Sequence, residues 1–149
     1  QFGPTNYAAC LGTGTTAGGP PYGSPWDADG LFRARLRTRL ADVPDGTSQT
    51  AAMSESLLGE GAENAFSATP PGDPQRVYAS PPIGTPLTPA ACAAARSWNV
   101  QRRRGFAWAT GEIRSGSYNH FARPNDPTPD CVTNLLAPAP RQFTGVGFR

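Results

Sequence analysis

A chain of 149 residues has the length of one domain and can bury roughly two-thirds of the surface that its unfolded form exposes. Seventeen Gly and seventeen Pro make it rich in loops, while three Trp, four Tyr and seven Phe can anchor a core. The net charge of +2 is too small to argue for nucleic acid binding, and no window is long and apolar enough to span a membrane. We therefore expect one globular domain over residues 1–149.

The first part of the chain carries two strand signals. The short apolar run Asn6 to Leu11 predicts a strand, and the Gly-rich run 12–19 predicts a loop. After a turn at Asp29-Gly30, the run Leu31 to Leu40 alternates arginine with mostly apolar residues, which predicts a strand with a charged face and a core face. The charged face consists of Arg33, Arg35, Arg37 and Arg39.

A tight turn at residues 45–48, Asp-Gly-Thr-Ser, comes just before the next element, Thr50 to Leu58. Ala51, Ala52 and Met53 are good helix formers, so propensity favours a short helix. A tight turn directly ahead of the run favours a strand instead. Both alternatives end at the Gly-Glu-Gly sequence of residues 59–61.

Prolines dominate the stretch from Ala68 to Pro89. Because proline cannot donate a hydrogen bond at a central position of a sheet, this stretch predicts a surface connection. Thr88 is a favourable N-cap and Pro89 a favourable first helical residue, and alanines follow as far as Arg96. This combination predicts a helix of about two turns.

The C-terminal part holds three further strand candidates. Gly105 to Ala109 has the aromatic content of a short buried strand, and Gly111 to Tyr118 is expected to return as a second strand. Asn119 to Pro129 predicts a loop. Gln142 to Phe148 alternates aromatic and small residues, which again predicts a strand.

Three cysteines, Cys10, Cys92 and Cys131, are spaced too widely for the paired pattern of a zinc site. In an oxidising compartment we expect a Cys92–Cys131 disulfide, because both residues lie in Pro-rich, weakly structured surroundings. Closing that loop would stabilise the fold by roughly 4 kcal/mol. Cys10 lies in an apolar run and is expected to be a buried small hydrophobe, with pairing between two chains as the less favoured alternative.

Catalytic signals are weak. The single histidine, His120, would need a distant serine and acid for a triad, and there is no G-x-S-x-G motif. The four glutamates show no spacing that nominates an acid pair for glycoside hydrolysis. His120 is therefore interpreted as a structural hydrogen-bonding residue, and an enzyme is not expected.

Calcium is the one cofactor hypothesis that the residues raise. Asp27-Ala-Asp29 has the spacing found at the start of a calcium loop, and Asp42 and Asp45 also lie in turns. The later ligand positions and the closing glutamate of such a loop are missing. Turn formation through side-chain hydrogen bonds is the commoner role of these aspartates, so calcium binding stays a hypothesis beside it.

The arginine face and the run 102–104 are the two basic features. They could hold an acidic polysaccharide or another polyanion, or the acidic face of a neighbouring subunit. The alternative is a solvated edge strand whose charges resist unwanted pairing. No aromatic residues are interleaved with either group, which argues against single-stranded nucleic acid.

Several short segments stand in a fixed order along the chain. They are Thr5 to Gly12, Asp29 to Phe32, Leu40 to Thr50 with Ser54-Glu55, Phe106 to Trp108, and Tyr118 to His120 through Pro124-Asn125 to Cys131. With this ordered set the chain resembles the bacterial prepilin-like proteins that carry an N-terminal type IV methylation motif and a C-terminal H-x9-D-G motif, a family of unknown function. Gln49 stands where the pattern of that family has Asn.

The resemblance implies export, processing like a type IV pilin or a pseudopilin of type II secretion, and assembly at or outside the cell surface. The chain matches the central globular part, without the family's membrane helix and without the H-x9-D-G motif. No catalytic residue can be carried over, because the family has no known activity.

These observations combine into one expectation. We expect an α+β domain, mostly β, resembling a pilin or pseudopilin head, with short antiparallel strands, one short helix and long Pro/Gly loops. Its expected function is that of a non-enzymatic, extracytoplasmic structural subunit that contacts copies of itself or other surface components. A surface module that binds acidic polysaccharide is the second hypothesis, and a secreted hydrolase the last.

Overall fold

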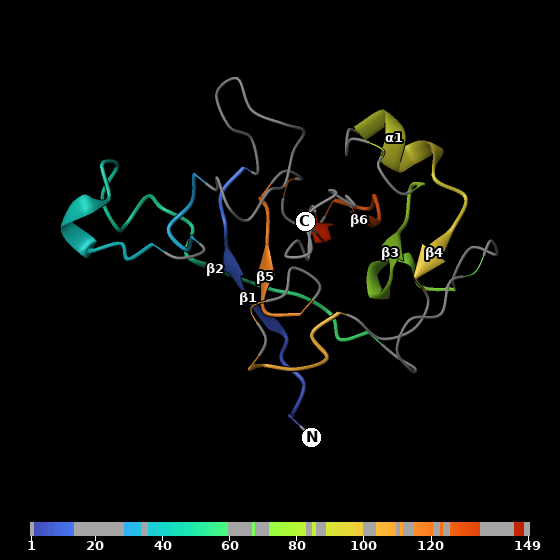
Figure 1. Ribbon diagram of the computed structural model, residues 1–149, viewed down its shortest axis with the longest axis horizontal. Helices are drawn as coiled ribbons and strands as arrows, with labels where there is room; N and C mark the ends of the chain where they lie inside the picture. The colour runs from blue at the N-terminus through green and yellow to red at the C-terminus, as the bar shows by residue number, and fades with distance from the viewer. Residues whose placement is uncertain are drawn as a thin grey trace.

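A computed structural model describes residues 2–13, 29–33, 36–59, 67, 72–82, 85, 89–99, 104–109, 111, 115–120, 123, 126–134 and 145–147. Within these residues the fold is α+β and mostly β, as expected, with short strands and one six-residue α-helix. The strands form two small sheets, one of three strands and one of four (Figure 1).

The first sheet has the order β2-β1-β5. β1 (Tyr7–Cys10) pairs antiparallel with β2 (Met53–Glu55) and parallel with β5 (Ser117–Tyr118). The predicted strand in Asn6 to Leu11 is therefore confirmed, and the element after the Asp-Gly-Thr-Ser turn is a strand. The side chains of Ala8, Cys10 and Tyr118 pack together as the core on one face of this sheet.

The second sheet has the order β4-β3-β6-β7. Its members are β3 (Tyr78–Ala79), β4 (Trp98–Asn99), β6 (Asp130–Asn134) and β7 (Gly145–Gly147). β7 confirms the strand expected within Gln142 to Phe148. β3 is antiparallel to β4 but parallel to β6, and β1 is parallel to β5, so the expectation of antiparallel pairing holds only in part.

One α-helix, α1 (Pro89–Ala94), lies near one end of the strands β3 and β4 of the second sheet (Figure 1). It begins at Pro89, as the sequence predicts. Cys92 of α1 forms a disulfide with Cys131 of β6, with the two Cα atoms 5.7 Å apart, which confirms the expected pairing. The buried side chains around this disulfide are Ala79, Cys92, Ala95 and Cys131, with Trp98 packed against them. Cys10 is free and buried, also as expected.

The segment 104–109 joins the two sheets. Its backbone follows the N-terminal segment, because the N–H of Thr5 donates to Gly105 at 2.7 Å and the N–H of Trp108 donates to Gly3 at 3.0 Å. The Arg104 side chain, in contrast, reaches the second sheet. There it forms an ion pair with Asp130 and lies over the Tyr78 ring, 5.4 Å from the ring centroid.

The predicted strand over Leu31 to Leu40 is wrong. The described residues between 31 and 39 form bends and irregular chain, and the 3-10 helix η1 spans Leu40–Asp42. A strand needs a partner and a face to bury, and this segment projects from the body of the molecule (Figure 1). Leu40 is 74% exposed, so the alternation of apolar residues does not mark a core face.

The Pro-rich stretch Ala68 to Pro89 is not only a surface connection. It contains the 3-10 helix η2 (Pro74–Arg76) and the strand β3, which lies between β4 and β6. Val77, Tyr78 and Ala79 are buried. The prolines flank β3 without entering it, so they do not interrupt its hydrogen bonds.

Gly105 to Ala109 is not a strand. Gly105 has a φ of +66°, and a Cβ at this position would collide with the carbonyl of Thr5, so the chain bends there. Ala107 is buried but Trp108 is 67% exposed. Within the described residues of Gly111 to Tyr118, the strand is β5 at the end of that run, while β4 and the five residues of β6 were not predicted.

Candidate functional site

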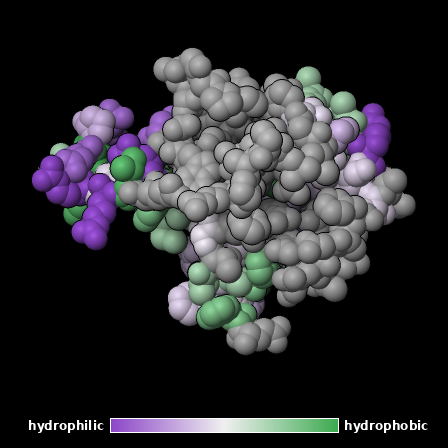
Figure 2. Space-filling model, viewed as in Figure 1, coloured by the Kyte–Doolittle hydropathy of each residue, from purple (hydrophilic) through white to green (hydrophobic). Residues whose placement is uncertain are grey.

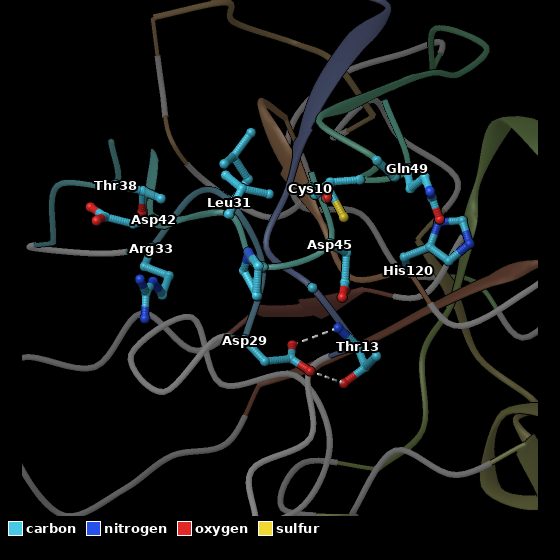
Figure 3. A pocket seen from close by; sticks show the side chains of 16 residues that line it. Cys10, Thr13, Asp29, Leu31, Arg33, Thr38, Asp42, Asp45, Gln49 and His120 are labelled. Carbon is cyan, nitrogen blue, oxygen red and sulfur yellow. Dashed lines mark hydrogen bonds between the residues drawn. The ribbon is translucent and has the colours of Figure 1, made fainter. Parts of the chain in front are cut away.

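A pocket of about 490 Å³ opens where β1 ends (Figure 3). Its volume lies within the range of small-molecule sites, roughly 300–1,000 Å³. Four chain segments and the side chain of His120 form its walls. The lining residues are Cys10, Gly12, Thr13, Asp29, Gly30, Leu31, Arg33, Thr38, Asp42, Val43, Pro44, Asp45, Gln49, Thr50, Ala51 and His120.

Two crossing glycines build one wall of the pocket. Gly12 and Gly30 lie so close that a Cβ on either would collide with the backbone of the other, and Gly12 has a φ of +99°. The Asp29 carboxylate locks this crossing, since it accepts a hydrogen bond from the Thr13 N–H at 2.7 Å and from the Thr13 hydroxyl at 2.6 Å. The role of Asp29 here is to fix two loops.

The η1 wall carries an ion pair. The Arg39 guanidinium donates to both oxygens of Asp42, at 3.0 Å from Nε and 2.9 Å from Nη2, and the Arg39 backbone N–H donates at 3.1 Å. The side-chain hydrogen bonds are the largest cause that lowers the pKa of Asp42 below its ordinary 3.8, and the backbone bond and the charge of Arg33 add to this. Asp42 is therefore ionised and already partnered.

The turn at residues 45–48 forms the third wall. Gly46 has a φ of +76°, and its carbonyl accepts hydrogen bonds from the Gln49 N–H at 3.3 Å and the Thr50 hydroxyl at 2.9 Å. These bonds stabilise the turn ahead of β2. In Figure 3 the Asp45 carboxylate points toward the side of the pocket that holds Asp29 and Thr13, and the Gln49 amide points toward the His120 ring.

The four aspartates proposed for calcium are only partly brought together. Asp29, Asp42 and Asp45 line the same pocket, whereas Asp27 lies outside the described residues. The described part of the chain contains no group of three or more His, Cys, Asp or Glu side chains placed to hold a metal ion. Asp29 and Asp42 bind Thr13 and Arg39 instead, and calcium binding stays a prediction.

His120 lies at the rim of the pocket with an exposed side chain. Its backbone N–H donates to the Gly12 carbonyl at 2.7 Å, and its ring lies 6.1 Å from the Tyr118 ring, centroid to centroid. Among the described residues, its imidazole has no hydrogen bond to a serine or a carboxylate. The pocket offers carboxylate, amide, hydroxyl and imidazole groups that can hold a polar ligand, without an assembled nucleophile and base in that part of the chain.

The predicted arginine face is not a face of a strand. Arg33, Arg37 and Arg39 are exposed, while Arg35 lies outside the described residues. Arg39 is engaged with Asp42, and Arg33 lies beside the acidic pocket. Binding of an acidic polysaccharide stays a prediction that now rests on the exposure of these side chains alone.

A second candidate surface was missed from the sequence. It is the outer face of β1 and β2, which we call the β1–β2 face and which consists of Tyr7, Ala9, Met53 and Glu55. Tyr7 is 51% and Met53 57% exposed, whereas Ala8 and Cys10 on the opposite face are buried. The Glu55 carboxylate accepts a hydrogen bond from the Tyr7 hydroxyl, and this bond is the main cause that raises the pKa of Tyr7.

Exposed apolar side chains extend beyond this face. Leu57 follows β2 with the same parity as Met53, and Phe2 stacks edge-on against Trp108 with ring centroids 6.3 Å apart. Figure 2 shows hydrophobic residues gathered at the end of the molecule where the N-terminus lies, and mostly hydrophilic residues on the projecting η1 segment. The sequence signal for this face was the run Tyr7-Ala8-Ala9-Cys10. In a strand, alternate residues face opposite sides, so the large Tyr7 side chain lies on the face opposite to Ala8 and Cys10.

Taken together, the fold and these surfaces define a small disulfide-bonded α+β domain with an exposed apolar sheet face. No helix among the described residues has the length and hydrophobicity to cross a bilayer. The family model SBP_bac_10, described as a protein of unknown function (DUF1559), matches residues 3–131, so the chain belongs to this family. The match shows neither the methylation motif nor the H-x9-D-G motif. Neither the curated proteins nor the solved structures include a match to the chain.

Proposed function

We propose that the chain is the globular part of a non-enzymatic structural subunit that assembles outside the cytoplasm, in the manner of a pilin or pseudopilin. The observation that carries this proposal is the exposed β1–β2 face, where Tyr7 and Met53 are more than half exposed although they belong to paired strands. Large apolar side chains left in water on a sheet are typical of a surface that meets another protein.

The disulfide supports the location. Cys92 and Cys131 join α1 to β6 at the centre of the second sheet, and such structural disulfides form and persist in oxidising compartments. A periplasmic, cell-surface or secreted protein fits this requirement. Attachment to a membrane would then depend on a segment encoded upstream of Gln1, as in a pilin of the type IV or type II secretion kind.

The side-chain chemistry supports a non-enzymatic role. The aspartates of the pocket are used to hold loops together, and His120 is the chain's single histidine. Catalysis by acid and base needs a proton donor and acceptor in mutual reach. Among the described residues, the His120 imidazole is hydrogen-bonded neither to a serine nor to a carboxylate. A substitution of His120 by Ala is expected to leave assembly unchanged.

The test uses the complete gene product in its own host, with an epitope tag. We expect the tagged protein to be accessible to protease on intact cells and to sediment as a polymer after shearing. The double variant Tyr7→Ser/Met53→Ser should be exported and form its disulfide but remain unassembled, because the apolar face is gone. Arg37→Ser, an exposed change away from that face, is the matched control and should assemble normally. A wild-type protein that stays monomeric or cytoplasmic would overturn the proposal.

A further inference from the structure

β2 forms one edge of the first sheet. β2 ends the strand order β2-β1-β5, and within the described part of the chain no strand pairs with its outer side (Figure 1). The Ala52 carbonyl accepts from Cys10 at 2.9 Å, and the Ser56 N–H donates to Asn6 at 2.8 Å. Because alternate residues of an antiparallel strand face the same neighbour, Met53 and Glu55 direct their backbone N–H and C=O groups outward.

This edge carries only part of the usual protection against pairing. Proline, lysine and bulges commonly block natural edge strands, and none of these occurs in Met53–Glu55; the protection present is the shortness of the strand and the charge of Glu55. Glu55 is the single charged residue of the strand, and its carboxylate is turned to the Tyr7 hydroxyl of the neighbouring strand. Among the described residues, no backbone group pairs with Met53 or Glu55 on this side; the Glu55 carbonyl accepts from the Ser54 hydroxyl at 3.2 Å and keeps a second lone pair for another strand.

We propose that this edge pairs with the same edge of a second copy of the chain, antiparallel and about a two-fold axis that passes between the two Ser54 residues. The proposal rests on the proposed function, since it names the contact through which subunits would meet. In this register Met53 of each copy lies opposite Glu55 of the other, and both residues are outward-facing. They therefore exchange both backbone hydrogen bonds, as opposed residues of an antiparallel pair do.

Self-pairing fits the residues of the edge. A two-fold contact uses one patch twice, so the patch must be complementary to itself, and the outward residues of β2 are symmetric about Ser54. The two Glu55 carboxylates do not lie directly opposite each other in this register, so direct like-charge repulsion is avoided. The result is a continuous sheet with the order β5-β1-β2-β2-β1-β5, whose outer face carries Tyr7 and Met53 of both copies.

The pairing is short and is expected to be weak in dilute solution. A three-residue strand offers few hydrogen bonds, so stable association would need the high local concentration of subunits held at a surface. A covalent trap is therefore the appropriate measurement. In the proposed register the two Ser54 residues form a non-hydrogen-bonded pair with Cα atoms about 4.5 Å apart, which is within the range that a disulfide spans.

The first experiment introduces Ser54→Cys in a Cys10→Ala background, so that the only free thiol is at the proposed axis. We expect a disulfide-linked dimer under mild oxidation on a non-reducing gel, with the new bond located by mass spectrometry. Ser48→Cys in the same background, an exposed turn position, is the matched control and should remain monomeric. A Ser54→Cys protein that cross-links no more than the control, or that links only to a different protein, overturns the proposal.

The second experiment removes the backbone N–H of Met53 that faces outward from β2. Met53→Pro deletes an N–H that makes no bond to β1, so the first sheet is retained, and sedimentation at millimolar concentration should show loss of the dimer. Met53→Thr keeps the N–H and should keep the dimer. A Met53→Pro chain that dimerises like wild type contradicts the pairing. If that variant still forms the surface polymer in cells, the edge contact is wrong while the proposed function stands; if wild type forms no polymer, the function itself fails.

Discussion

Asp42 shows how a single residue of the candidate site is used. Sequence reasoning treated it as one of four possible calcium ligands, but its two oxygens are engaged by the side chain and backbone of Arg39. The bond from the Arg39 N–H is that of a capping box, because Arg39 is the N-cap residue of η1 and Asp42 its third residue. The role of Asp42 is therefore set by Arg39, three residues earlier in the chain. The sequence pattern had predicted that Arg39 lies in a strand.

The pKa of Asp42 provides the prediction at this scale. Because Arg39 stabilises the charged form, the carboxyl should titrate below its ordinary 3.8 in an NMR titration of its side-chain carbon. Because the pKa of Asp42 is lower in the folded chain than in the unfolded chain, the stability from the Arg39–Asp42 contact is fully present at a pH above the unfolded-state pKa. That stability is lost as the pH falls through the folded-state pKa. Arg39→Ser should raise the midpoint toward 3.8, whereas Arg37→Ser should not. A wild-type midpoint at or above 3.8 would show that the contact is absent in solution.

At the scale of elements, the sequence predicted correctly the features that a segment's own residues determine. It failed for several strands, whose formation depends on a partner strand elsewhere in the chain. The start of α1 at Pro89 follows from backbone geometry that proline itself fixes. The alternation in Leu31 to Leu40 had no such anchor, because a strand exists only where another strand pairs with it. β3 was missed for the converse reason. Two residues flanked by prolines carry almost no local signal, yet β4 and β6 hold them on both sides.

The candidate site was predictable to a similar degree. The turn at residues 45–48 and the aspartates near it were visible in the sequence. Their meeting in one pocket depends on the crossing of Gly12 with Gly30, a contact between segments far apart in the chain. The open edge of β2 depends on strand order, which no single segment encodes. In each case the missing information was which segments become neighbours.

The disulfide between α1 and β6 carries the prediction at the scale of elements. The two cysteines are 39 residues apart, and closing a loop of this length removes enough unfolded-state entropy to stabilise the fold by about 4 kcal/mol. Urea denaturation with and without reductant should show a loss of this size. The double variant Cys92→Ser/Cys131→Ser should no longer respond to reductant, while Cys10→Ala should respond like wild type. An unchanged midpoint, with all thiols shown to be free, would rule out a stabilising role.

On the scale of the whole molecule, the described residues give each sheet its own buried cluster. Ala8, Cys10 and Tyr118 form one cluster, and the residues around the disulfide form the other. Arg104 connects them, since its backbone carbonyl accepts from Gly59 at 3.0 Å on the side of the first sheet while its side chain pairs with Asp130 at the start of β6. Both charged side chains are nearly buried, with 8% and 10% of their surface exposed.

Breaking this buried pair should uncouple the sheets. Asp130→Asn keeps the shape of the side chain but leaves the Arg104 charge buried without its counter-charge, which costs on the order of 3–5 kcal/mol. The expected result is a lower midpoint of urea unfolding. When hydrogen exchange is followed at increasing denaturant concentration, the amides of β1 should lose protection at a different concentration from the amides of β3 and β6. In wild type both groups should exchange together.

Asp42→Asn is the matched control for that variant. It makes the same change of charge in an ion pair, but the Arg39–Asp42 pair is exposed, and exposed pairs contribute little to stability. Its midpoint and its exchange pattern should therefore stay close to wild type. If Asp130→Asn behaved in the same way, Arg104 would not be what holds the sheets together. The coupling would then have to come from the backbone bonds of the segment 104–109 to the N-terminal residues, which both variants leave intact.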